Sequence, residues 1–159
     1  MATFDLTSIQ TPTHNSSERV VYSMEAVLDI STIANYSCTD GDIFQVMEIP
    51  ANSIIVGGAV EVLTAFNGTT PTVDIGVTGS GPDVLIDGQS VAGTGYLGAA
   101  NNGLASGYNK QISTADTLDV KLNAGSADVT SGKLRVVLVL CDVSNKGADA
   151  VSAARDILA

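Results

Sequence analysis

The sequence predicts an all-β fold, an antiparallel β-sandwich of jelly-roll type with about eight strands. Apolar residues make up 45% of the chain but aromatic residues only 4%, so Val, Ile, Leu and Ala supply the core, and the β-branched residues among them favour strands. Short apolar stretches recur along the chain and are separated by Gly-rich turns, as in sandwiches and barrels. A clear helical pattern is confined to the last residues.

The 159 residues suit a single domain, which we expect to follow an extended arm. Small polar residues dominate this arm, and Phe4, Leu6 and Ile9 are its apolar anchors. The spacing of these anchors predicts that the arm docks as an edge strand, and a terminus without fixed structure is the alternative. The predicted parts are an arm at residues 1–18, a sandwich at residues 19–143 and a tail with a short helix at residues 144–159.

The first half of the sandwich consists of long apolar stretches. Residues 19–30, "RVVYSMEAVLDI", have the apolar density of a strand, although their Met, Glu and Leu residues also allow a short helix. Two more strands are predicted at residues 42–49 and 53–66. The break between them at Pro50 and Asn52 indicates either a β-hairpin or a corner between two sheets.

The middle of the chain alternates strands with glycine. The pair Gly57-Gly58 suits a β-bulge. Residues 72–78, "TVDIGVT", place apolar side chains on one face and polar ones on the other, which predicts a half-buried antiparallel strand. Residues 83–88, "DVLIDG", predict a short strand that ends in a turn at Asp87-Gly88.

A long loop separates the last strands from the rest. Residues 92–109 hold five glycines and three asparagines, which predicts a loop without regular structure. Alternation resumes at residues 118–122, and residues 133–143, "KLRVVLVLCDV", are apolar on both faces, so this strand should lie centrally. After it, Val151 and Leu158 share one face of a predicted short helix.

The charge of the chain excludes some partners. Seven basic residues face seventeen acidic ones, for a net charge of −10. A nucleic acid or an anionic membrane surface would be repelled, so we expect neither as a partner. The N-terminal "MATFDLTSIQ" lacks the pattern of a signal peptide, and no apolar stretch reaches the length of a membrane span, so we expect synthesis in a cytoplasm.

The sequence offers no arrangement of residues for catalysis, metal binding or cofactor binding. His14 is the single histidine, and Cys38 and Cys141 are too few for a cysteine-based zinc site; whether they pair is left open. No calcium-binding loop pattern is present. "GTGYLG" at Gly93–Gly98 has the spacing of a dinucleotide site, but the residues after it would break the helix that such a site needs. We therefore expect a protein that is not an enzyme.

Two tyrosines, Tyr96 and Tyr108, bracket the long loop. They are candidates for contacts with a sugar or a protein partner, because tyrosine is enriched at interfaces. The alternative is that both are ordinary half-buried side chains.

The order of several motifs resembles small structural proteins of tailed bacteriophages, particularly those of marine and cyanobacterial phages. The motifs are "GDIFQVMEIPANSIIVGGAVEVLT", "TVDIGVTG", "DVLIDG" and "SGKLRVVLVLCDV", which together cover roughly Gly41 to Val143. The resemblance implies a virion protein on the exterior of the capsid that decorates or cements it, often as a homotrimer between capsomers. It implies the major capsid protein and further copies of the chain as partners, with no catalytic residues.

Two alternatives stay open. One is another virion component, such as a knob, fibre or tail protein, and the other is a carbohydrate-binding β-sandwich that uses the loop at residues 92–109. The candidate partner contacts are the arm residues Phe4, Leu6 and Ile9 and the helix residues Val151 and Leu158, which would clasp a neighbour on the capsid, and the loop residues Tyr96 and Tyr108, which would meet a glycan or another partner.

Overall fold

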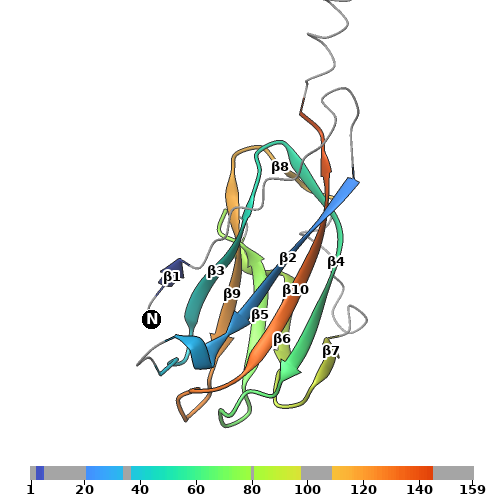
Figure 1. Ribbon diagram of the computed structural model, residues 1–159. Helices are drawn as coiled ribbons and strands as arrows, with labels where there is room; N and C mark the ends of the chain where they lie inside the picture. The colour runs from blue at the N-terminus through green and yellow to red at the C-terminus, as the bar shows by residue number, and fades with distance from the viewer. Residues whose placement is uncertain (1–2, 6–20, 34–36, 80, 98–108, 145–159) are drawn as a thin grey trace, which may run out of the picture.

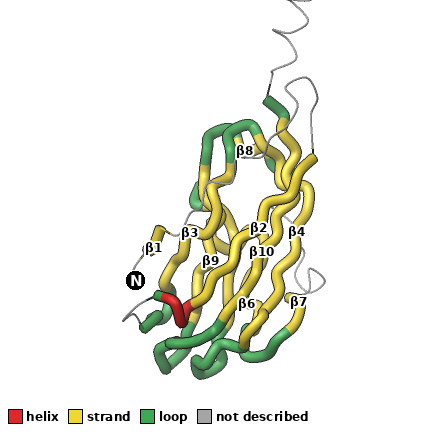
Figure 2. The backbone as a smooth tube through the Cα atoms, viewed as in Figure 1, coloured by secondary structure: helices red, strands yellow, loops and turns green. Residues whose placement is uncertain are grey.

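The computed structural model describes residues 3–5, 21–33, 37–79, 81–97 and 109–144, which form two β-sheets packed face to face (Figure 1). Sheet A contains β1 (Thr3–Asp5), β3 (Asp42–Ile49), β9 (Asp116–Asn123), β5 (Thr72–Val77) and β6 (Gly81–Ser90), in that order. Sheet B contains β2 (Val21–Asp29), β10 (Lys133–Asp142), β4 (Ser53–Thr64), β7 (Gly95–Leu97) and β8 (Gln111–Ile112). The helical element of the described ranges is a 3-10 turn, η1 (Ile30–Thr32), drawn red in Figure 2.

The strand order is that of a jelly roll. Strands β7 and β8 both pair antiparallel with β4, β7 at Val60–Val62 and β8 at Ser53 and Ile54, so the two short strands share one position in sheet B. Counted this way and without β1, sheet B takes the first, eighth, third and sixth strands and sheet A the second, seventh, fourth and fifth. The predicted antiparallel sandwich is therefore confirmed, and its connections are those of two Greek keys.

The chain changes sheets at the break after β3. Because β3 belongs to sheet A and β4 to sheet B, the break is a corner between sheets and not a β-hairpin, which decides between the two predicted alternatives. Asn52 takes the left-handed conformation at φ 59°, which asparagine tolerates better than most residues. Its N–H donates to the carbonyl of Ile112 at 2.6 Å, which fastens the corner to β8.

The predicted strand at the start of the sandwich and the predicted central strand are both confirmed. The segment that favoured either a strand or a helix forms the nine-residue β2. Strand β10 lies between β2 and β4 and pairs antiparallel with both. The bulge predicted at Gly57-Gly58 falls one residue earlier, since Gly57 pairs with Val139 and Ile55 with Leu140, which leaves Val56 as the extra residue.

Two local predictions are wrong. Asp87-Gly88 does not end a strand, because β6 continues through it to Ser90. The pair is a bulge against β5, with Gly88 at φ 60°, a conformation that glycine adopts at little cost. The predicted loop at residues 92–109 contains β7, which pairs with β4, so this part of it has regular structure.

Strand β5 is more buried than its half-apolar pattern predicts. Val73, Ile75 and Val77 face the core as expected, but Asp74 and Gly76 on the opposite face are buried as well. The start of β6 crosses this face: a Cβ on Gly76 would lie 2.1 Å from the carbonyl oxygen of Gly81. A glycine is needed here because the two backbones approach more closely than a side chain permits.

The core fills the space between the sheets. Its largest fully buried side chains come from both sheets and include Phe44, Leu118, Leu28 and Leu138. Within the described residues, no buried side-chain nitrogen or oxygen lacks a hydrogen-bond partner. The sandwich thus meets the two main requirements of a stable core, apolar packing and paired polar groups.

The two ends of the chain are described only in part. Residues 3–5 form β1, which pairs parallel with β3 at the edge of sheet A, as the edge-strand prediction anticipated for this arm. The predicted C-terminal helix lies outside the described residues. The proposed division into arm, sandwich and tail stays a prediction.

We predict that Gly76→Ala destabilises the protein by about 2 kcal/mol or more, because its Cβ must displace the backbone at Gly81. The matched control is Gly57→Ala, also within a strand, where the added Cβ would lie 4.0 Å from the Val139 Cβ. The control should change the free energy of unfolding by less than about 1 kcal/mol. Urea unfolding of both variants checks this, and equal losses of stability would contradict the close approach.

Candidate interaction faces

The described residues contain no assembled metal site: no group of three or more His, Cys, Asp or Glu side chains is placed to hold an ion in this part of the chain. No helix in the described ranges has the length and hydropathy to span a membrane. Cys38 and Cys141 are both free thiols. What distinguishes the molecule is the contrast between the outward surfaces of its two sheets.

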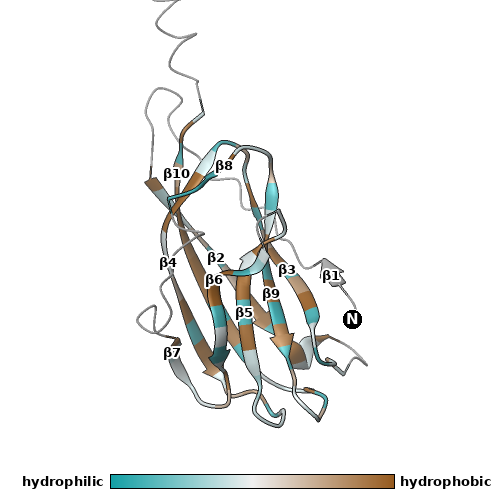
Figure 3. Cartoon of the chain, turned by 180° about the vertical axis from the view of Figure 1, so that it is seen from behind, coloured by the Kyte–Doolittle hydropathy of each residue, from teal (hydrophilic) through white to brown (hydrophobic). Residues whose placement is uncertain are grey.

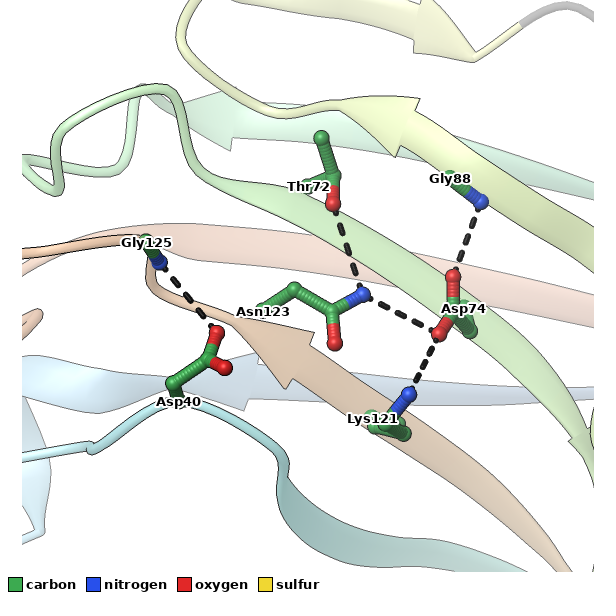
Figure 4. Close-up of polar contacts among 7 residues, drawn as sticks. All are labelled: Asp40, Thr72, Asp74, Gly88, Lys121, Asn123 and Gly125. Carbon is green, nitrogen blue, oxygen red and sulfur yellow. Dashed lines mark hydrogen bonds and ion pairs between the residues drawn. The ribbon is translucent and has the colours of Figure 1, made fainter.

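The outer face of sheet A carries a polar network around Asp74 (Figure 4). The Asp74 carboxylate pairs with the Lys121 ammonium at 2.9 Å and accepts from the Asn123 amide at 3.0 Å and from the Gly88 N–H at 2.8 Å. The last bond holds the bulge of β6 to β5, because Asp74 belongs to β5. Burial by itself raises the pKa of Asp74, but these hydrogen bonds and the Lys121 charge outweigh it, so the pKa lies below its usual value.

A second carboxylate on the same face has a different environment. Thr78 and Thr117 each contact Asp119 through their hydroxyl oxygens at 2.7 Å, and the two hydroxyls lie 3.1 Å apart. When Asp119 is ionised, the Thr78 and Thr117 hydroxyls supply two protons for these three oxygen–oxygen contacts. Protonation of Asp119 supplies the third proton. Burial raises the pKa of Asp119, the two hydroxyl donors oppose the rise, and the nearby Asp116 carboxylate adds to it.

A shallow hollow of about 510 Å³ lies beside this second network. Several polar groups that line it already have partners: Gln45 donates to Thr117 at 3.0 Å, and Asp116 accepts from the N–H of the neighbouring Gly79 at 2.9 Å. These groups stabilise the end of sheet A, and they do not converge on a reacting atom. The full lining is Gln45, Glu48, Ile49, Pro50, Thr78, Ala115, Asp116 and Thr117.

The outer face of sheet B is apolar over one half, which we call the apolar half. Strand pairing places Val21, Cys141 and Ile54 in one row across β2, β10 and β4, followed by rows that contain Val139 and Val137. Val21 is 58% exposed, and the bulge residue Val56 is 42% exposed. All large apolar side chains that are exposed in the described ranges belong to sheet B, namely Val21, Val27, Val56, Leu63 and Tyr96.

The other half of this face carries charges that are already paired. Lys133 pairs with Asp29 at 3.0 Å, and Arg135 pairs with Glu61 on the neighbouring strand. Teal segments recur along β9, β5 and β6 in Figure 3, where sheet A faces the viewer. The two outer faces therefore differ: sheet A is hydrogen-bonded and acidic, and sheet B is apolar beside a band of compensated charge.

The structure places few of the predicted contact residues on a common surface. Tyr96 lies on β7 beside Glu61 and is 70% exposed, so it is free to make contacts. Phe4 belongs to β1, with its side chain outside the description. The remaining candidates, Leu6, Ile9, Tyr108, Val151 and Leu158, lie outside the described residues.

Sequence reasoning missed the apolar half of sheet B. Its signal was present, because β10 and β4 are apolar on both faces although each strand has one face toward the core. From the sequence, this pattern predicts only a central position in a sheet. In a two-layer sandwich a central strand still has one face outside, so outward Val137 and Val139 are in excess of what the core needs.

These observations define a jelly-roll protein with one polar and one apolar outer face. Its fold is similar to a chain in the capsid of Ralstonia phage GP4, with a TM-score of 0.61 and 16% identity over 89% of this chain and 99% of that one. It is also similar to a chain of the cyanophage Pam1 capsid asymmetric unit, with a TM-score of 0.54 and 18% identity over 84% and 92% of the two chains. No family model and no curated protein sequence matches the chain.

We predict that Asp74→Asn lowers the free energy of unfolding by about 2 kcal/mol at pH 7, because it removes the ion pair with Lys121 and weakens the bond to Gly88. The depressed pKa means that this stabilisation is present at pH values above about 4 and is lost as the pH falls through the folded-state pKa. Unfolding measured from pH 3 to pH 8 should show the variant and the parent converge at acid pH.

The opposite sign is predicted for Asp119→Asn. An amide supplies the third proton of the Thr78–Thr117 contact ring, and the raised pKa means that ionisation of Asp119 costs stability as the pH rises. The variant should equal or exceed the parent in stability at pH 7, with the difference disappearing below about pH 4. A loss at pH 7 like that of Asp74→Asn would show that Asp119 is needed in its ionised form.

Proposed function

We propose that the chain is a non-enzymatic structural protein of a phage virion, which decorates or cements the capsid exterior by bridging capsomers as a homotrimer. The observation that carries this proposal is the extent of the fold match. The match covers 99% of the chain from the capsid of Ralstonia phage GP4 and 89% of this chain, so the two share a whole architecture and not a local motif.

The outer faces support a structural role. On sheet A the buried carboxylates Asp74 and Asp119 are held by neighbouring strands, an arrangement that stabilises the sheet and leaves no activated nucleophile beside them. On sheet B the exposed valines offer a contact surface. A protein built to bind other proteins repeatedly needs a rigid scaffold and a surface, and both are present.

Cementing follows from binding across junctions. A protein that binds the assembled shell but not its separated parts stabilises assembly by mass action. Three linked copies multiply weak contacts into a strong attachment through effective concentration. In this proposal the major capsid protein is the partner, and Phe4, Leu6, Ile9, Val151 and Leu158 provide contacts from the two ends of the chain.

One observation favours a second candidate. Tyr96 is 70% exposed at the start of the segment that leads into residues 98–108, a place where an aromatic ring can stack on a sugar. A knob, fibre or tail protein, or a carbohydrate-binding sandwich, would use the loop at residues 92–109 and Tyr108 in this way.

The first test combines mass and binding. We expect light scattering of the purified chain to show a trimer, and we expect the trimer to co-sediment with empty shells assembled from the major capsid protein of the same phage. Deleting residues 1–18 should weaken co-sedimentation if the arm clasps a neighbour. Tyr96→Ala should leave co-sedimentation unchanged, which makes it the control for the glycan-binding alternative.

A chain that stays out of the shell pellet at every concentration would contradict the cement proposal. Glycan-array binding that Tyr96→Ala abolishes would then favour the second candidate.

A further inference from the structure

The apolar half of sheet B carries less charge than the outer face of sheet A. The outermost row contains Val21, Cys141 and Ile54, and the next row contains Val139 beside Val56. Neither row contains a charged side chain. Glu25 borders this region opposite Val137. In a chain with a net charge of −10, such a neutral area is a distinctive surface.

Charge decides which partner fits this surface. Two copies of a protein with ten excess negative charges repel each other at long range, so they associate through a face whose own charges are absent or compensated. The outer face of sheet A does not meet this condition, because Glu48, Asp74, Asp116 and Asp119 outnumber Lys121. Sheet B comes closer to it, because its two outermost rows carry no charged side chain and Lys133 and Arg135 pair with Asp29 and Glu61, which leaves Glu25 as the excess charge of the rows named here.

We propose that the outer face of sheet B is the surface through which copies of this chain associate, with the apolar half at the centre of the contact. This inference rests on the proposed function, which includes self-association of the chain. It adds the face through which the copies would associate. The paired charges of Asp29, Lys133, Glu61 and Arg135 form the polar rim, as interfaces commonly have.

The size of the face is consistent with this assignment. Four strand positions spaced about 4.8 Å apart and about ten residues long span roughly 600 Å². A standard interface buries about 800 Å² on each partner, so the whole face approaches that size while the apolar half alone does not. We therefore expect association that uses the full face and depends on protein concentration.

Cys141 is a built-in reporter for the contact. It lies half-buried in the outermost apolar row, opposite Val21 and Ile54, and its thiol is free. The other thiol, Cys38, is fully buried, and burial together with Asp42 and Asp128 raises its pKa to about 11, so it reacts slowly. A thiol reagent applied to the folded protein therefore reports on Cys141.

The test uses Val21→Asp and Val56→Asp, two changes at exposed positions that the core does not need. We expect either variant to shift the light-scattering mass toward the monomer at a concentration where the parent is oligomeric. The matched control is Ala115→Asp, which adds the same charge at an exposed position beside the hollow of sheet A, away from the outer face of sheet B, and which should keep the parent mass. Circular dichroism confirms that all three variants are folded.

Labelling of Cys141 gives a second readout. In the parent the rate should fall several-fold as the protein is concentrated, and in Val21→Asp it should not change with concentration. Variants that keep the parent mass, together with labelling that is independent of concentration, would overturn the proposal. Faster labelling after deletion of residues 145–159, at concentrations where the chain is monomeric, would also overturn it, because the tail would then be the occupant.

The outcome can be separated from that of the capsid experiment. An oligomer that loses association in Val21→Asp but ignores capsid shells would contradict the proposed function and leave the assignment of the face intact. Conversely, a chain that binds shells but whose association is unaffected by Val21→Asp and Val56→Asp would support the proposed function and contradict the assignment of the face.

Discussion

The pairing of β10 with strands on both sides is the interaction on which the sandwich depends. This strand joins the first and third strands of the jelly roll into one sheet, because it pairs with β2 along one side and with β4 along the other. Leu134, Val136, Leu138 and Leu140 point inward from it and are buried. Since side chains alternate along a strand, fixing these four residues in the core also fixes which residues face outward. The outer face of sheet B is thus set by the requirements of the core.

The two sheets use their outward positions differently. On sheet A, the outward residues of β5 and β9 bond to one another across strands, and one of these bonds reaches the bulge at Gly88. Removing a partner there leaves a buried polar group unsatisfied, so these positions are committed to stability. On sheet B the outward valines of β10 contribute little to the core, and partial exposure of large apolar groups has a cost that association would relieve. The hydrogen-bonded carboxylates and the exposed apolar side chains therefore lie on opposite faces of one molecule.

Periodicity and turn chemistry predicted the sheet architecture and the central place of β10, because both follow from local pattern. The errors share a physical origin, which is contact between residues distant in the chain. Asp87-Gly88 has the sequence of a turn, but Asp74 accepts a hydrogen bond from Gly88 and β6 continues as a bulge. Asp119 has the pattern of an exposed residue, yet the hydroxyls of Thr78, directly after β5, and of Thr117 on β9 enclose it. The candidate contact residues were sought at the chain ends and around a loop, whereas the exposed valines belong to strands whose pattern also satisfies a core.

A strongly acidic surface and self-association make conflicting demands, and the distribution of charge over the two sheets resolves the conflict. Dispersed acidic groups keep free copies apart at long range, and this repulsion weakens with salt. Burial of valine methyl groups is insensitive to charge and acts only at contact, where packing is complementary. If copies associate through sheet B as proposed, a chain with its unbalanced acidic groups mainly on sheet A and its exposed apolar side chains on sheet B would stay dispersed until copies meet in one orientation. Such orientation is what a shell-bound oligomer with an outward acidic face would require.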